Sequence, residues 1–261
     1  MKHCIFSILL SLFTAVLAGQ DVAVCGFTNK KVITIQGSQV TGGPHTNFPI
    51  LIDHTDAVNL TTAAGKVTSA NGFDIIFADD NANLLDFQLE SYNGATGEIV
   101  AWVKIPTLTN GTDVDIHMLY GKATVVTDQS TTGVWDANYV SIYHMNNNDF
   151  SDATVNTNNI VNSGSTNNTG SKIGGGRTVN SSNLDYMQVG TSGWAPGSGT
   201  IGFWGNQSSF SANHQYYIGH TTIPAFANRI QIFTDDAGGN LDLGLGDAHF
   251  RHTNIVALNP G

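Results

Sequence analysis

Oxygen-bearing side chains cluster in the segment from Asp235 to Asn240, which reads Asp-Asp-Ala-Gly-Gly-Asn. Carboxylate and amide oxygens on a loop are the ligands that calcium prefers. Asp235, Asp236 and Asn240 are therefore candidate ligand-binding residues, and Asp235 and Asp236 are the candidate calcium ligands. The same letters also encode an ordinary hairpin connection. We favour the hairpin connection, because the sequence offers no second acidic cluster to complete a calcium shell.

A calcium-like spacing of oxygens also begins at Asp79, where Asn81, Asn83 and Glu90 follow at two, four and eleven residues. The glycine that such a loop needs is replaced by Leu84, and the residues after it alternate like a strand rather than an exiting helix. Asp and Asn also cap their own backbone in tight turns. The pattern therefore predicts a hairpin turn, not a calcium loop.

Catalytic groups are scarce in this chain. Glutamate occurs only at Glu90 and Glu98, so residues 134–261 contain no glutamate pair that could cleave a glycosidic bond. The sequence has no Gly-x-Ser-x-Gly elbow, and Cys25 has no recognisable catalytic partner near it. We therefore expect a protein without enzymatic activity.

Two further motifs match functional patterns by their letters only. Residues 197–202 fit Gly-x-Gly-x-x-Gly, but a predicted strand begins inside the motif where a nucleotide site needs a helix N-terminus. His249 and His252 lie three residues apart, so on a strand they face opposite sides and cannot grip one ion. We interpret the first as a glycine-rich turn and the second as a surface strand end.

Aromatic residues in the C-terminal half are candidates for stacking on a sugar ring: Trp194, Trp204, Tyr216 and Tyr217. In a β-sandwich, Trp204 and one of the two adjacent tyrosines must point inward to build the core. Trp194 stands beside an Ala-Pro-Gly loop. The sequence therefore predicts Trp194 as the aromatic ligand contact.

The composition favours strands and turns and excludes one class of partner. Charged residues make up 11% of the 261 residues, against roughly 25% in an average globular protein, and Asn, Thr, Ser and 29 glycines supply the polarity instead. The formal net charge is −10, with only 10 Lys and Arg. Such a chain repels a polyanion, so nucleic acid is not an expected partner.

The N-terminus reads as an export signal. Lys2 supplies a positive charge, an apolar stretch follows, and Val16-Leu17-Ala18 provides a small-residue cleavage site, so residues 1–18 are the expected signal peptide. No later segment is long and apolar enough to span a membrane. We expect a secreted or cell-surface protein of bacterial type, with Cys25 as the single cysteine after cleavage.

Short blocks of alternating apolar residues run from Lys30 to Gly121, separated by turn-rich pieces, as in an antiparallel sandwich. In order, the blocks read KKVITI, NFPILID, FDIIFADD, LLDFQLESYN, IVAWVKIP and IHMLYG. This order resembles the bacterial family named domain of unknown function 2341 (DUF2341), over residues 27–121. The resemblance implies an extracellular β-sandwich module, and the family usually carries a Glu where this chain has Gln88.

A second module is expected over residues 134–261, after a Thr- and Ser-rich connector at 122–133. Residues 146–183 are dense in Asn, Ser, Thr and Gly, which predicts long exposed loops. Later strand-like blocks read LDYMQVG, TIGFWG, HQYYIG, RIQIFT, LDLGLG and TNIVAL. With an IGGGR motif, their order resembles a laminin G-like or concanavalin A-like lectin sandwich. That resemblance implies a jelly roll whose loop rims bind calcium or sugars. Its late strands are missing, so we expect an incomplete module linked to further domains of a longer chain.

The sequence therefore predicts an all-β protein of two antiparallel sandwich modules. We expect a secreted or cell-surface recognition protein that binds a polysaccharide or other glycan through its C-terminal module. It should require no cofactor, with calcium as the one candidate ion. The alternative is a structural spacer or adhesin segment of a larger surface protein that binds no small molecule.

Overall fold

The protein is all-β in the residues that the computed structural model describes, which are 26–190, 199–210, 215–222, 227–234, 241–245 and 248–251. Strands and three short 3-10 helices are the regular elements of these ranges. The all-β prediction is confirmed. The chain divides into two compact units, Met1–Pro196 and Gly197–Gly261.

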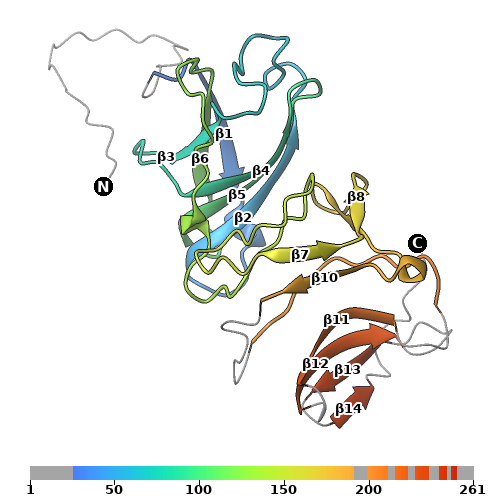
Figure 1. Cartoon of the computed structure of the whole chain (residues 1–261). Helices are drawn as coiled ribbons and strands as arrows, with labels where there is room; N and C mark the ends of the chain where they lie inside the picture. The colour runs from blue at the N-terminus through green and yellow to red at the C-terminus, as the bar shows by residue number, and fades with distance from the viewer. Residues whose placement is uncertain are drawn as a thin grey trace, which may run out of the picture. The chain divides into compact units, whose positions relative to one another are not determined.

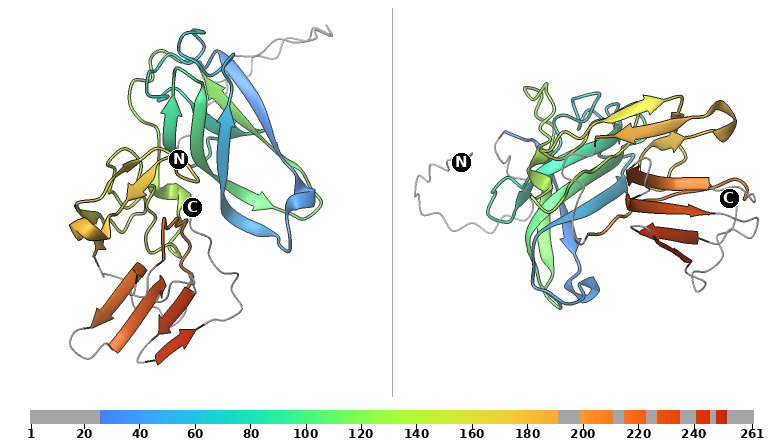
Figure 2. Two further views of the ribbon diagram at one scale, coloured as in Figure 1. Left: turned by 90° about the vertical axis from the view of Figure 1, so that its right-hand side faces the viewer. Right: turned by 60° about the horizontal axis from the view of Figure 1, so that its bottom comes forward.

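The first unit contains a sandwich of two three-stranded antiparallel sheets (Figures 1 and 2). One sheet has the order β1-β6-β3 and the other the order β2-β5-β4. The strands are β1 (Asn29–Ile35), β2 (His45–Thr55), β3 (Ile76–Asp79), β4 (Phe87–Asn93), β5 (Glu98–Leu108) and β6 (Val114–Tyr120), with a 3-10 turn η1 (Gly37–Gln39) between β1 and β2.

Strand β5 shows why these residues form a sandwich. Its residues alternate, so Ile99, Ala101, Val103 and Ile105 are fully buried on one face of the sheet. Trp102 and Lys104 fall on the opposite face, which we call the outer face, and both are only half-buried there. The outer face of β5 is therefore covered by other parts of the chain rather than left to solvent.

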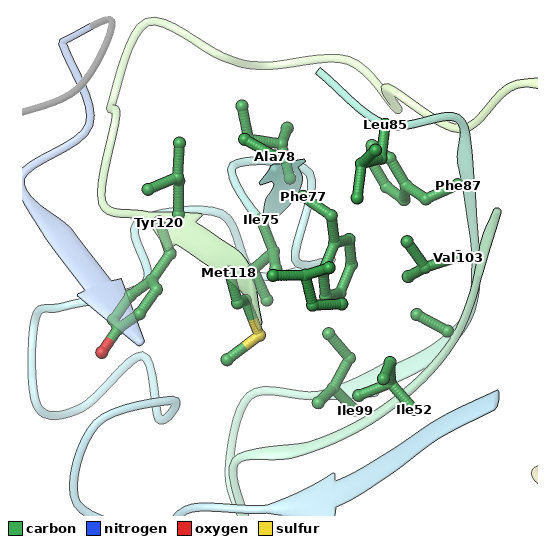
Figure 3. Close-up of a cluster of buried hydrophobic side chains, with 14 of the residues drawn as sticks. Ile52, Ile75, Phe77, Ala78, Leu85, Phe87, Ile99, Val103, Met118 and Tyr120 are labelled. Atoms are coloured by element: carbon green, nitrogen blue, oxygen red, sulfur yellow. The ribbon is translucent and has the colours of Figure 1, made fainter. Parts of the chain in front are cut away.

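The core is centred on Phe77, whose side chain is fully buried. Its ring meets the ring of Phe87 edge to face, with the centroids 5.4 Å apart. Figure 3 shows Phe77 between Met118 and Ile75 on one side and Phe87 and Val103 on the other. Both sheets thus contribute to one continuous apolar cluster.

The turn after β3 is the hairpin turn that the sequence predicts. Asp79 Oδ1 accepts hydrogen bonds from the backbone N–H groups of Asn81 and Asn83, at 2.9 and 2.8 Å. Asp79 Oδ2 accepts a third from Asn83 Nδ2, at 2.9 Å. The carboxylate is thus occupied in capping its own turn.

Loops and short ribbons make up the rest of the first unit. Asp152 anchors the loops, because its buried carboxylate accepts from the backbone N–H groups of Ile142, Thr154 and Asn158. Two antiparallel ribbons follow, in which β7 pairs with β10 and β8 pairs with β9. The elements here are η2 (Thr132–Val134), β7 (Ile160–Ser163), β8 (Thr166–Asn168), β9 (Gly176–Thr178), η3 (Ser181–Asn183) and β10 (Tyr186–Val189).

The second unit contains a four-stranded antiparallel sheet in the order β11-β12-β13-β14. These strands are β11 (Gln215–Thr222), β12 (Ala227–Thr234), β13 (Leu241–Leu245) and β14 (Ala248–Arg251). The strand expected at 200–205 is absent, and these residues run as irregular chain. Throughout the part of the chain that is described, no helix has the length and apolar character needed to cross a membrane.

Candidate functional site

Five side chains meet on the outer face of β4 and β5, and we call them the outer-face node: Gln88, Glu90, Trp102, Trp135 and His144. Gln88 and Glu90 reach this face because they alternate with the core residues Phe87 and Leu89. The pairing of β4 with β5 shifts between Leu89 and Ser91, which leaves Glu90 as the extra residue of a β-bulge. Bulges re-aim a side chain in this way.

The carboxylate of Glu90 is the most enclosed charge of the node, with a side chain only 3% exposed. Its Oε2 accepts a hydrogen bond from Trp102 Nε1 at 2.8 Å and lies 3.0 Å from His144 Nδ1. Its backbone carbonyl accepts from Asn146 Nδ2 at 2.9 Å. Glu90 therefore ties the bulged strand to the segment that follows Trp135.

Gln88 makes the second half of the node. Its Oε1 accepts from Trp135 Nε1 at 2.6 Å and lies 3.0 Å from His144 Nε2. Its Nε2 donates to the carbonyl of Ala153 at 2.9 Å. All the polar atoms of this buried amide thus find partners, as a buried polar group requires.

Aromatic rings cover the node. The Trp135 ring packs against Trp102 with centroids 5.3 Å apart, against Tyr139 at 5.2 Å and against His144 at 6.2 Å. Burial raises the pKa of the Tyr139 hydroxyl, and the nearby Asp136 carboxylate adds to the effect. The rings keep water from the hydrogen bonds beneath them, which strengthens those bonds.

A second polar cluster closes the edge of β4. The carbonyl of Phe87 accepts from Thr131 N at 2.8 Å, and Lys104 Nζ lies 2.6 Å from Asp86 Oδ2. Burial alone would raise the pKa of Asp86, but hydrogen bonds from Lys104 and Thr131 and the charge of Lys104 lower it overall. The carboxylate therefore stays ionised and holds the chain before Trp135 in place.

The IGGGR motif at 173–177 lies against the node as a strap. A Cβ on Gly174, whose φ is +50°, would lie 2.4 Å from Glu90 Oε1, and one on Gly175 would lie 2.4 Å from Asn146 Oδ1. Only glycine allows this approach. Arg177 anchors the strap, because its guanidinium donates to Asn148 Oδ1 at 2.9 Å and stacks 4.7 Å from the Phe150 ring centre.

The arrangement holds chain segments together rather than presenting a reactive group. Glu90 Oε2 already receives two contacts, and the strap covers the carboxylate. In the described ranges no group of three His, Cys, Asp or Glu side chains is placed to hold a metal ion. The node thus links β4, β5, residues 135–153 and the glycine strap into one body.

The ligand residues predicted from the sequence, Trp194, Asp235, Asp236 and Asn240, lie outside the described residues, as do the signal peptide, Cys25 and His252. Strands β12 and β13 pair in antiparallel fashion up to Thr234 and Leu241. Residues 235–240 lie between these two strands in the sequence. The hairpin connection and the calcium site both stay predictions.

The inward orientation predicted for Trp204 is wrong. Its side chain is 72% exposed, because residues 199–205 form no strand and nothing forces alternation there. Phe203 and Tyr216 are also large exposed apolar groups, at 46% and 53%. We call these three exposed side chains of the second unit, Phe203, Trp204 and Tyr216, the aromatic patch, a name for their shared exposure. Tyr217 links the chain segments that carry them, since its ring lies 5.6 Å from that of Phe203.

Comparison with known families identifies part of the chain. Residues 71–162 match the family described as domain of unknown function (DUF2341). The predicted resemblance to this family, expected over residues 27–121, is confirmed for residues 71–121, and residues 27–70 lie outside the match. The match runs beyond residue 121 through the connector, and it includes all five residues of the outer-face node. The resemblance to a laminin G-like or concanavalin A-like domain is not confirmed by a family match.

Neither the curated proteins nor the solved structures contain a significant match to this chain.

The node was not predicted as a unit. The alternation Phe87-Gln88-Leu89-Glu90 places two polar residues on one face of a strand, and it is the feature of the sequence that indicates part of the node. Their partner His144 lies 56 residues after Gln88.

We predict that Gln88→Leu lowers the free energy of unfolding of the first unit by about 2–4 kcal/mol, since Trp135 Nε1 and the Ala153 carbonyl lose their partners in a buried site. Urea unfolding followed by tryptophan fluorescence measures the change. Gln129→Leu is the matched control, because Gln129 is exposed and bonds only to Thr127. Equal losses in both variants would contradict the structural role of the node.

Proposed function

We propose that this chain is an exported, non-catalytic recognition protein that binds carbohydrate through its second unit. The observation that carries the proposal is the aromatic patch of Phe203, Trp204 and Tyr216. Phe203 and Trp204 are adjacent in the chain, and exposed apolar surface of this kind is a feature of binding sites. Aromatic side chains suit sugar binding, because the flat apolar face of the ring can pack against a sugar. The side chain also loses little conformational entropy when it is held in place.

Charge and composition support a neutral glycan as the ligand. The net charge of −10 disfavours anionic partners, whereas stacking on a neutral sugar needs no positive surface. The resemblance of residues 134–261 to lectin-type jelly rolls adds a reason to look at a polysaccharide. Asp235, Asp236 and Asn240 would then supply oxygens that bind calcium or form hydrogen bonds with the sugar. Trp194, the other ligand contact predicted from the sequence, belongs to the first unit and would act there by itself.

We predict that Tyr216→Ala and Trp204→Ala each weaken glycan binding about 10- to 100-fold, since ~1.5–3 kcal/mol of apolar burial is lost with each ring. A panel of immobilised neutral polysaccharides, probed with the purified mature chain, provides the measurement. Tyr186→Ala is the matched control: Tyr186 is 55% exposed, nearly the same as Tyr216, but lies on β10 in the first unit. Binding that survives both patch variants would refute the aromatic patch as the site.

The role of calcium is tested by measuring binding to the same panel, and the thermal midpoint of the protein, in calcium and in chelator. Both measurements compare the unchanged chain with an Asp235→Ala/Asp236→Ala variant. A calcium-dependent thermal midpoint that the double variant abolishes would establish the loop as a calcium site. An unchanged midpoint would leave it as a hairpin connection only.

The second candidate function is a structural spacer or adhesin segment, and the outer-face node favours it. Buried hydrogen bonds join the sandwich to residues 135–153 and to the glycine strap, which suits a stiff support for other domains. If this protein binds no member of the polysaccharide panel, with or without calcium, the structural spacer or adhesin segment remains as the candidate function.

A further inference from the structure

The orientation of the Gln88 amide follows from its two fixed partners. Trp135 Nε1 can only donate a hydrogen bond, and the Ala153 carbonyl can only accept one. Reversing the amide would place its NH2 group against a donor and its oxygen against an acceptor. Gln88 Oε1 therefore faces Trp135 and, 3.0 Å away, His144 Nε2.

Both ring nitrogens of His144 consequently face acceptors. Nε2 faces Gln88 Oε1, and Nδ1 faces Glu90 Oε2 at 3.0 Å. A neutral imidazole carries one N–H and one lone pair, so it can satisfy only one of these contacts. Two protons are needed: one on Nε2, which Gln88 Oε1 accepts, and one on Nδ1, which Glu90 Oε2 accepts.

We propose that His144 and Glu90 form a proton-dependent clamp that closes the segment from Trp135 to Asn146 over the sandwich. With the proton in place, every contact of the node pairs a donor with an acceptor. When it leaves, a lone pair of His144 faces either Glu90 or Gln88 in a site that is nearly closed to water. The clamp then loosens, and residues 135–146 and the Gly174 strap open more often.

The surroundings of His144 leave Glu90 as its charged partner. Within the described residues, Glu90 on β4 forms the ion pair with His144. The neighbours from β5 and from residues 135–146 are the neutral Trp102 and Trp135 side chains and the amide of Asn146. Arg177 of the strap is engaged with Asn148 and Phe150 instead.

The direction of the pH effect follows from the count of bound protons. Histidine is the side chain that ordinarily changes its charge between about pH 5 and 8. Loss of the shared proton leaves a lone pair of His144 facing an acceptor, so the contacts between His144, Glu90 and Gln88 weaken once the pair is deprotonated. The clamp is closed in mildly acid solution and loosened in mildly alkaline solution.

The test uses the full chain with histidine labelled with nitrogen-15. At mildly acid pH, both ring nitrogens of His144 should show the chemical shifts of protonated nitrogens, with the signal assigned by its loss in His144→Gln. The protection of the amides of residues 135–146 against hydrogen exchange, taken relative to the intrinsic base-catalysed rate at each pH, should fall about 10-fold or more at mildly alkaline pH. A neutral His144 at mildly acid pH would overturn the proposal, and this readout needs no variant to fold.

Variants separate the clamp from a general pH effect. His144→Gln and Glu90→Gln should each remove the pH dependence of the protection of residues 135–146 against exchange. His117→Gln is the matched control, because His117 pairs with Asp80 at 3.1 Å in the other sheet, and it should leave the dependence intact. The same pH dependence in all three variants would overturn the proposal.

Discussion

Phe77→Ala should lower the free energy of unfolding of the first unit by about 3–5 kcal/mol, the usual cost of removing a buried phenylalanine ring. Phe77 is fully buried between the two sheets and meets Phe87 edge to face. Its neighbours come from both sheets, so they cannot collapse into the vacated space without moving the strands. Because whole domains are stable by only about 5–15 kcal/mol, the loss should be visible as a large fall in the urea midpoint.

Phe48→Ala is the control for this experiment, since Phe48 lies on β2 with 45% of its surface exposed. We expect it to cost less than about 1 kcal/mol. If the two phenylalanine variants unfolded at the same urea concentration, the position of the core would have to be revised.

Asp74→Ala should be nearly as damaging, with an expected loss of about 3–4 kcal/mol. The Asp74 side chain is completely buried, and its carboxylate accepts from Thr68 N at 2.8 Å, Thr68 Oγ1 at 2.7 Å, Ser69 N at 3.0 Å and Gly121 N at 3.2 Å. Alanine leaves these donors without a partner in a site closed to water. Thermal unfolding followed by circular dichroism measures the effect.

Asp53→Ala provides the comparison, because Asp53 is exposed on β2. It removes the same charge from the chain while leaving the buried donors intact, so we expect a change within about 0.5 kcal/mol. A similar loss in both variants would mean that net charge, and not the buried network, sets the stability.

The two proposals for this chain concern different units and can fail separately. Glycan binding depends on the aromatic patch and on the loop from Asp235 to Asn240, all in the second unit. The proton-dependent clamp depends on His144 and Glu90 in the first unit. Loss of glycan binding in Tyr216→Ala would therefore leave the exchange of residues 135–146 unchanged.

Local patterns in the sequence determined most of the first sandwich. Residues such as Ile99, Ala101 and Val103 alternate with outward residues, and a strand has no other way to bury them than on one face. The turn at Asp79 was predictable for a similar reason, since a short side chain bonds to the backbone only a few residues away. Both effects are contained within a few neighbouring residues.

The alternation of apolar residues led to a wrong prediction where the chain does not form the expected strand. The letters around Trp204 suggest a strand with an inward tryptophan, but whether such a segment pairs depends on a neighbouring strand edge, which its own residues do not specify. The irregular chain at 199–205 leaves Trp204 72% exposed. That exposure is what points to the aromatic patch.

The outer-face node was decided by the tertiary structure alone. The sequence places Gln88 and Glu90 on one face of β4, but it does not show that this face is covered. The bulge at Glu90 and the return of His144 bring the three side chains together across 56 residues of chain. No periodic pattern records such a contact, because hydrogen bonds between distant segments are selected by packing and by the need to pair every buried donor and acceptor.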